Sequence, residues 1–237
     1  MRQRLAVTLL GFALVVEIAC TASGQSPVIH SVTVGGTSVV IPSPAYDLVE
    51  AGDSNRQGLE MYVGEANRLL CAFLLTNDIP RFANHPNLRL SKYALAFVGR
   101  RSEYMDCGPL DFQNQVDAYK QSFKQSLQDD ASIAAMMKDV DKSLDPISKM
   151  LDTKVLLDKP VPLGVYFSKE DAFGYGMATQ VTRNEQSWKM AGGFALLRVR
   201  QRQIVISLYT TYEGEQTLKW LRVATERWAD EIIKTNE

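Results

Sequence analysis

The spacing of apolar residues changes three times along this chain, and those changes limit the folds that it can adopt. Two β-branched runs, 28–34 and 37–42, flank Gly35 and Gly36. Because both central positions of a tight hairpin turn favour positive φ, this pattern predicts a β-hairpin. The runs 69–75 and 92–101 are apolar on both faces, which is typical of central strands.

The segment between the hairpin and these strands contains prolines, glycines and polar residues. It predicts a loop that reaches residue 58, with a short helical turn at 46–50.

The apolar spacing becomes three and four after Gly108 and returns to two after Gly164. The first change predicts an amphipathic helix over 111–127, with Asp111 available as its cap. A second helix is predicted from about residue 131 until Pro146 interrupts it. Strands at 165–167, 172–182, 188–200 and 203–212 follow, with the last turn at residues 201–202, and then a final amphipathic helix from 218 to about 236.

The first 24 residues have the pattern of a secretory signal peptide. Arg2 and Arg4 form a positively charged start, and residues 5–16 are an apolar run of the length that such signals have. A membrane-spanning helix needs roughly 20 apolar residues, and Glu17 interrupts the run earlier. Cleavage after residue 24 predicts an exported chain, periplasmic or secreted, with no integral membrane span. A buried N-terminal helix and an uncleaved anchor are the alternatives.

Cys20 suggests a second processing route, because bacterial lipoproteins are modified on a cysteine at the end of the apolar run. Glu17 stands where such a signal normally has an aliphatic residue, usually leucine. The sequence therefore favours cleavage over lipidation at Cys20.

The remaining 213 residues, 25–237, suffice for one hydrophobic core and are fewer than usually divide into two domains. Strands, then helices, then strands and a final helix indicate the α+β class. We therefore expect a single α+β domain over 25–237, with a mainly antiparallel sheet covered by amphipathic helices and a helical segment at about 111–150.

The mature chain carries almost no net charge. Removal of Arg2, Arg4 and Glu17 with the leader reduces 26 basic and 27 acidic side chains to 24 and 26, a formal charge of −2. Such a surface has no field that would recruit nucleic acid or an anionic membrane. We expect no nucleic acid ligand, and instead a protein partner or a small anion that local groups recognise.

Cys71 and Cys107 are the two cysteines of the mature chain. An even number in an exported protein permits one disulfide. Cys71 lies in the apolar run 69–75 and Cys107 precedes Gly108 in a turn-like segment, so a bridge would join a loop to a central strand. A buried thiol at Cys71 and an unpaired one at Cys107 are the alternative, because free cysteine is often buried.

The opening hairpin leads into the Ile-Pro segment 39–44 (VVIPSP), an antiparallel meander follows, and the terminal helix carries a tryptophan. Together these features resemble the Mog1/PsbP-like α-β-α sandwich proteins, a family that includes exported bacterial proteins of unknown function. The resemblance spans residues 28–236 and implies that fold, but it carries over no functional residue. The helical segment at 111–150 and the glycine-containing hairpin depart from the family's pattern.

Sequence motifs that would indicate catalysis are absent. The two histidines, His30 and His85, are too few for a histidine metal site. No G-x-S-x-G, S-x-x-K or Walker-type motif occurs. Gly174 and Gly176 fall inside a predicted strand, where they indicate a bulge or a close backbone approach. We expect no catalytic residue, no metal and no cofactor.

Alternating arginines are the one local feature suited to a ligand. Arg198 and Arg200 would share one face of the predicted strand 188–200, because side chains two positions apart point the same way. Near Arg100 and Arg101, they would form a patch for a phosphate or a carboxylate. The alternative is that these charges only keep an exposed sheet face or edge soluble.

These observations favour an exported, non-catalytic binding or assembly module, since catalysis requires a nucleophile, a base or a metal set. The alternative is a secreted enzyme whose active-site residues are dispersed over strands and loops. A sandwich without a pocket would favour the module, whereas a cleft lined by carboxylates or tyrosines would favour the enzyme.

Overall fold

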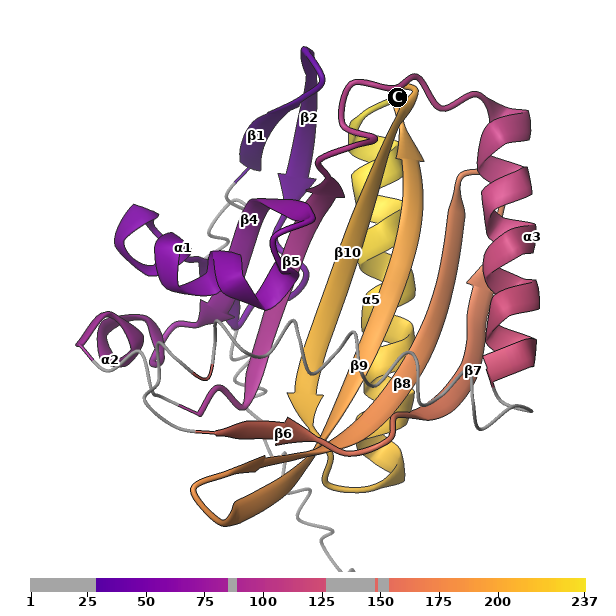
Figure 1. Ribbon diagram of the computed structural model, residues 1–237. Helices are drawn as coiled ribbons and strands as arrows, with labels where there is room; N and C mark the ends of the chain where they lie inside the picture. The colour runs from indigo at the N-terminus through magenta and orange to yellow at the C-terminus, as the bar shows by residue number, and fades with distance from the viewer. Residues whose placement is uncertain (1–28, 85–88, 127–147, 149–153) are drawn as a thin grey trace, which may run out of the picture.

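The computed structural model describes residues 29–84, 89–126, 148 and 154–237 (Figure 1). The predicted signal peptide and the second predicted helix lie outside these residues. The described part consists of an eight-stranded sheet, a separate two-stranded hairpin, and helices on both faces of the sheet. None of the helices in the described ranges is both long enough and apolar enough to span a membrane.

The hairpin consists of β1 (Ile29–Val34) and β2 (Thr37–Pro42), paired antiparallel in the predicted register. Gly35 and Gly36 have φ of +53° and +83°, so both turn positions have the backbone conformation for which glycine was expected. Val34, Val39 and Ile41 are fully buried, which joins the hairpin to the main core.

The sheet runs in the order β3-β4-β5-β10-β9-β8-β6, with β7 also paired to β8, and every pairing is antiparallel. Its strands are β3 (Leu48–Glu50), β4 (Asn67–Leu75), β5 (Lys92–Gly99), β6 (Val155–Leu157), β7 (Val161–Ser168), β8 (Ala172–Arg183), β9 (Gln186–Val199) and β10 (Arg202–Thr211). Together with the helices, this arrangement confirms the predicted α+β class with a mainly antiparallel sheet.

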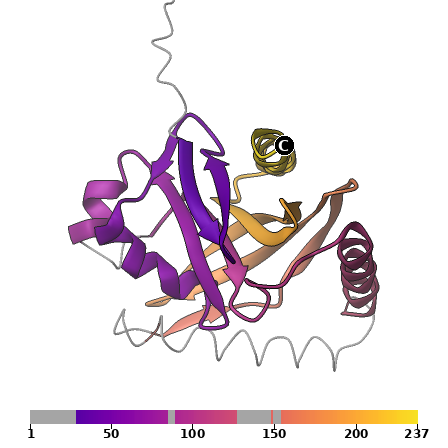
Figure 2. The same ribbon diagram turned by 90° about the horizontal axis from the view of Figure 1, so that it is seen from above.

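Helix α5 (Glu215–Thr235) lies along one face of the sheet, as Figures 1 and 2 show from two directions. It contacts β2 of the hairpin and strands β7 to β10. Leu221, Trp228 and Ile232 are completely buried in this interface. The final predicted helix is therefore confirmed, and its apolar side forms the largest hydrophobic cluster together with the sheet and the hairpin.

The opposite face is covered near its two ends (Figure 2). Helices α1 (Asp53–Glu60), η1 (Met61–Val63) and α2 (Ile79–Asn84) pack near β4 and β5. At the other end, α3 (Pro109–Ser126) packs Phe112 and Val116 against β8 and β9. Helix α3 begins with a proline, which is well suited to the first helical position. It confirms the amphipathic helix that the sequence predicted there.

A row of aromatic rings crosses this second face between the helices. Successive rings have centroids 4.6–6.1 Å apart, within the range of favourable aromatic pairs. The row consists of Tyr62, Tyr93, Tyr209, Phe194, Tyr175 and Phe173. It links η1, β5, β10, β9 and β8 through side chains, in addition to the backbone ladders.

Three local predictions differ from the structure. Residues 48–50 form β3 rather than a helical turn, because Leu48 pairs with Leu75 at the edge of the sheet. The predicted loop before residue 58 contains α1, whose Leu59 is fully buried. The β9–β10 turn is centred on residues 200–201, one position earlier than predicted, and both residues have positive φ, at +48° and +63°.

Two side chains of the C-terminal segment tie the hairpin to α5. The buried indole Nε1 of Trp228 donates a hydrogen bond to the Pro42 carbonyl at 2.8 Å, and its ring meets Phe73 edge-on at 5.9 Å. The side-chain amide of Asn236 accepts from the Val40 amide at 2.8 Å and donates to the Val40 carbonyl at 2.7 Å. These bonds place residues 39–44 directly beside the terminal helix.

Replacing Trp228 with phenylalanine should lower the free energy of unfolding by about 2–3 kcal/mol, because it leaves the buried Pro42 carbonyl unpaired and opens a small cavity. Trp220→Phe is the matched control, since Trp220 is only partly buried and its indole N–H meets no acceptor among the described residues. It should cost less than about 1 kcal/mol. Urea unfolding followed by circular dichroism measures both, and equal losses would show that the Pro42 bond contributes nothing specific.

Candidate binding pocket

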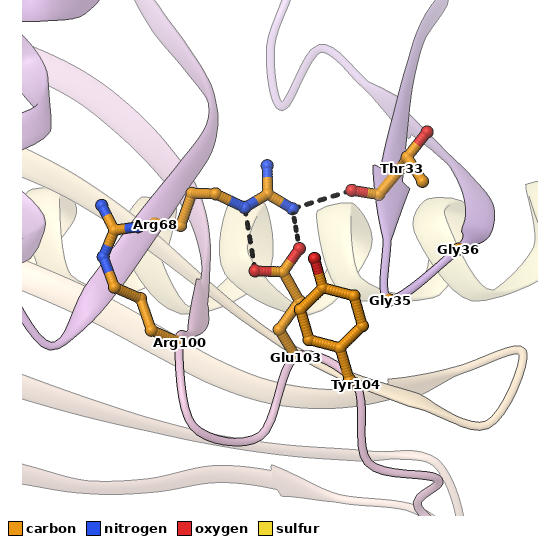
Figure 3. A pocket seen from close by; sticks show the side chains of 7 residues that line it. All are labelled: Thr33, Gly35, Gly36, Arg68, Arg100, Glu103 and Tyr104. Atoms are coloured by element: carbon orange, nitrogen blue, oxygen red, sulfur yellow. Dashed lines mark hydrogen bonds and ion pairs between the residues drawn. The ribbon is translucent and has the colours of Figure 1, made fainter.

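A cavity of about 470 Å³ lies where the hairpin tip meets the segment that follows β5 (Figure 3). Its walls come from four separate parts of the chain: the end of β1, the hairpin turn, the start of β4 and the β5–α3 segment. The lining residues are Thr33, Gly35, Gly36, Arg68, Arg100, Glu103 and Tyr104.

Gly35 brings the hairpin tip against the β5–α3 segment. A Cβ atom at this position would collide with the backbone carbonyl of Glu103, and φ of +53° is one that other residues rarely adopt. A Cβ at Gly36 would meet no atom within 4 Å. Glycine is therefore required at Gly35 for two reasons, and the close approach that it permits forms one wall of the cavity.

Arg68 connects three of the four walls. Its Nε donates to Oε2 of Glu103 at 3.0 Å, its Nη2 donates to the other carboxylate oxygen, and Nη2 also donates to the Thr33 carbonyl at 2.8 Å (Figure 3). Such a two-pronged contact fixes the orientation of both side chains. Nη1 of Arg68 points away from these acceptors and has no partner among the residues described.

Glu103 is held as a carboxylate. The hydrogen bond and the positive charge of Arg68 lower its pKa, although burial by itself would raise it. Both carboxylate oxygens accept hydrogen bonds from Arg68. Glu103 is therefore poorly suited to accept a proton near neutral pH.

Arg100 and Tyr104 line the pocket on opposite sides of the Arg68–Glu103 pair (Figure 3). The Arg100 amide donates to the Ala66 carbonyl at 2.9 Å and its Nε donates to the Glu65 carbonyl at 3.2 Å. Neither terminal nitrogen of Arg100 has a partner in the described ranges. Tyr104 is 77 % exposed. With two arginines and one glutamate, the ionised groups of the lining have an excess of one positive charge.

The predicted anion residues Arg198 and Arg200 have different partners in the structure. Arg198, in β9, forms an ion pair with Asp171. Arg200, in the β9–β10 turn rather than in the strand, donates from Nε to the Asn236 carbonyl at 2.8 Å and from Nη1 to the Ser38 carbonyl at 3.1 Å. A ligand at these two residues stays a prediction. The pocket instead uses Arg100, which was expected nearby, and Arg68, which no sequence pattern singled out.

Cys71 and Cys107 are both free and buried. They lie in different hydrophobic clusters, Cys71 beneath the hairpin and α5, and Cys107 beside Phe112 of α3. Burial is the main cause that raises the pKa of each thiol. The structure therefore has free buried thiols rather than the disulfide that the sequence permits, and neither thiol is activated as a nucleophile.

The glycines in β8 make room for aromatic rings. A Cβ at Gly174 would collide with the ring of Phe167, and a Cβ at Gly176 with the ring of Tyr166, both on the facing strand β7. The glycines lie inside a strand as predicted, but what approaches them is aromatic side chains rather than backbone.

Within the described ranges, no three His, Cys, Asp or Glu side chains gather closely enough to hold a metal ion. His85 lies outside the described residues.

The fold and pocket define an α+β sandwich with a cavity at the end of its sheet. No family model matches the chain, and no curated protein matches it. Among solved structures, it is similar to a mutant of the protein Mog1, with a TM-score of 0.34 and 11 % identity over 88 % of this chain and 94 % of the other. It is also similar to the Ran-binding protein Mog1p of Saccharomyces cerevisiae, with a TM-score of 0.32 and 11 % identity over 89 % of this chain and 95 % of the other.

These values amount to a weak structural resemblance to Mog1, and they assign no ligand or partner to this chain. The resemblance to exported bacterial proteins stays a prediction.

Glu103→Gln should change the acid stability of the protein. Because the folded-state pKa of Glu103 is lowered, its stabilising contribution is fully present above the unfolded-state pKa of about 4.3 and is lost as pH falls through the folded value. The variant should therefore be less stable by about 1–2 kcal/mol near neutral pH, with the difference shrinking as pH falls below the unfolded-state pKa. Urea unfolding across this pH range measures it. Glu60→Gln, on an exposed part of α1, is the control, and parallel curves for Glu103→Gln and the unaltered protein would contradict the expectation.

Proposed function

We propose that this chain is an exported, non-catalytic binding module that holds an anionic group of its ligand in the pocket beside the hairpin tip. The observation that carries the proposal is the set of donors that face the cavity. The terminal nitrogens of Arg100 and Nη1 of Arg68 have no described partner, and Tyr104 lies on the other side of the Arg68–Glu103 pair from Arg100 (Figure 3).

A carboxylate is the group that fits these donors best. Guanidinium groups bind planar carboxylates through paired hydrogen bonds, and such charge-assisted bonds are stronger than those between neutral groups. The pocket has an excess of one positive charge, which one carboxylate neutralises. Arg68 is already oriented by Glu103 and Thr33, so binding there immobilises few further groups.

The chemistry of the lining supports binding rather than catalysis. The one carboxylate of the pocket, Glu103, is paired with Arg68 and has a lowered pKa, which disfavours a role as general base. The nearby Ser102 hydroxyl donates to the Gly99 carbonyl at 3.2 Å and does not line the cavity. The lining thus lacks an activated nucleophile–base pair.

Arg100→Ala should weaken carboxylate binding by about tenfold or more, because it removes charge-assisted hydrogen bonds. The probes are sodium acetate and a hexaglutamate peptide, added at constant ionic strength, with backbone amide shifts followed by NMR. Arg81→Ala removes a largely exposed arginine of α2 that pairs with Asp78 and lies outside the pocket lining, and it is the control for the loss of one positive charge. If Arg100→Ala and Arg81→Ala bind these probes as the unaltered protein does, the pocket is not a carboxylate site.

Export is supported by the N-terminal pattern of Arg2, Arg4 and the apolar run 5–16. Expressed with its own N-terminus in a bacterial host, the chain should accumulate outside the cytoplasm with the mass of residues 25–237. Leu9→Arg interrupts the apolar run and should retain the full-length chain in the cytoplasm, whereas Cys20→Ala should change nothing. Intact-mass spectrometry of cell fractions measures this, and a retained leader or a lipid adduct on Cys20 would contradict the proposed route.

A further inference from the structure

Three large apolar side chains are exposed on the segment that leads from the pocket to α3. Tyr104, Met105 and Leu110 are 77 %, 63 % and 73 % exposed, and all belong to the stretch between β5 and the first turn of α3. Single exposed apolar residues are normal, whereas several gathered on one segment indicate an interaction surface. We call these three residues the apolar strip. Tyr104 belongs to both the strip and the pocket, so one ligand can contact both.

The segment that carries the strip is anchored at several points. The Met105 amide donates to the Ser102 carbonyl at 3.0 Å, and the Cys107 amide donates to the Gln201 carbonyl at 2.8 Å. Asp106 forms an ion pair with Arg202 at 2.8 Å. The exposed side chains are therefore presented on a fixed backbone, which reduces the entropy lost when a ligand binds.

The acidic and basic side chains around the apolar strip differ in whether they form ion pairs. Glu103 is paired with Arg68 and Asp106 with Arg202, whereas Asp111, which follows Leu110, accepts a hydrogen bond from the Gly108 amide and has no described basic partner. Arg100 and Arg101 are exposed and neither forms a described ion pair, although the charge of Arg100 contributes to lowering the pKa of Glu103. The surface at the Tyr104 end of the apolar strip, next to Arg100 and Arg101, is therefore complementary to negative charge.

We infer that the pocket and the apolar strip together bind an extended segment of a protein partner in which a carboxylate side chain stands next to an aliphatic or aromatic one. The carboxylate enters the pocket at Arg100, the apolar side chain packs on Tyr104, Met105 and Leu110, and further acidic residues face Arg101. This inference rests on the proposed function, because the same pocket must hold the carboxylate. A free small anion would leave the strip exposed, which is why a peptide segment explains more of the surface.

The test compares two fluorescein-labelled peptides that carry equal negative charge. One repeats Glu-Leu-Glu-Phe three times, and the other repeats Glu-Gly-Glu-Ser three times. Anisotropy titrations with the mature chain at constant ionic strength should show about tenfold or greater preference for the first peptide, because only it has apolar side chains to bury. Arg100→Ala should weaken both peptides.

The double variant Met105→Ser/Leu110→Ser isolates the strip without altering the pocket lining. It should reduce the affinity for the apolar-containing peptide towards that for the Gly/Ser peptide, with the remaining preference due to Tyr104, and leave the affinity for the Gly/Ser peptide unchanged. Tyr46→Ser/Val223→Ser is the matched control, since these side chains are 99 % and 64 % exposed elsewhere on the molecule. Urea unfolding of each variant verifies that the fold is retained.

The outcomes separate the two proposals. Equal binding of both peptides, weakened by Arg100→Ala and unaffected by the strip variant, would overturn the peptide segment and leave the carboxylate pocket. Binding of neither peptide, or binding independent of Arg100, would overturn both. Concentration-dependent dimers in analytical ultracentrifugation that disappear in Met105→Ser/Leu110→Ser would identify a second copy of this chain as the occupant, and would also overturn the inference.

Discussion

The hydrogen bond from the Trp228 indole to the Pro42 carbonyl determines where the hairpin lies on the sheet. A two-stranded hairpin is at best marginally stable alone in water, so β1 and β2 depend on what they pack against. Asn236 reinforces the position by pairing with both backbone groups of Val40. The tip of this hairpin forms one side of the pocket. The pocket therefore depends on Trp228 and Asn236 of the C-terminal segment, although neither residue lines it.

Arg68 holds the other end of the hairpin, its turn, in position. Its contacts with Glu103 and Thr33 join β4, β1 and the β5–α3 segment, and they require the close approach that Gly35 permits. Taking a partly buried ion pair out of water costs much of what the two charges gain from their attraction. Its main effect is therefore geometric, because a guanidinium that binds a carboxylate through two nitrogens permits few other arrangements of the three segments.

The sequence predicted those elements whose periodicity is long and regular: the hairpin around Gly35 and Gly36, the meander after residue 164, and the helices that became α3 and α5. It missed β3 and α1, since a short edge strand such as β3 is specified by its partner Leu75 rather than by local pattern. The pocket could not be predicted from the sequence either, because Arg68 and Glu103 are 35 positions apart and form no motif. An arginine inside the apolar strand β4 was the one available signal. The predicted face of Arg198 and Arg200 failed to form for a local reason, as the turn begins at Arg200.

The arginines at this end of the molecule fall into two groups, which differ in whether their terminal N–H groups make contacts within the protein. Arg200 and Arg202 donate to the hairpin at Ser38 and Thr37, and Arg68 donates to Thr33, so each of them is held by contacts within the protein. Arg100 and Arg101 keep their terminal nitrogens towards solvent. Changes in the first group must therefore alter stability and binding together, whereas changes in the second can alter binding while the fold is unaffected. Arg68, Arg200 and Arg202 therefore hold the hairpin and the neighbouring segments in place, and Arg100 and Arg101 determine which ligand binds to this surface.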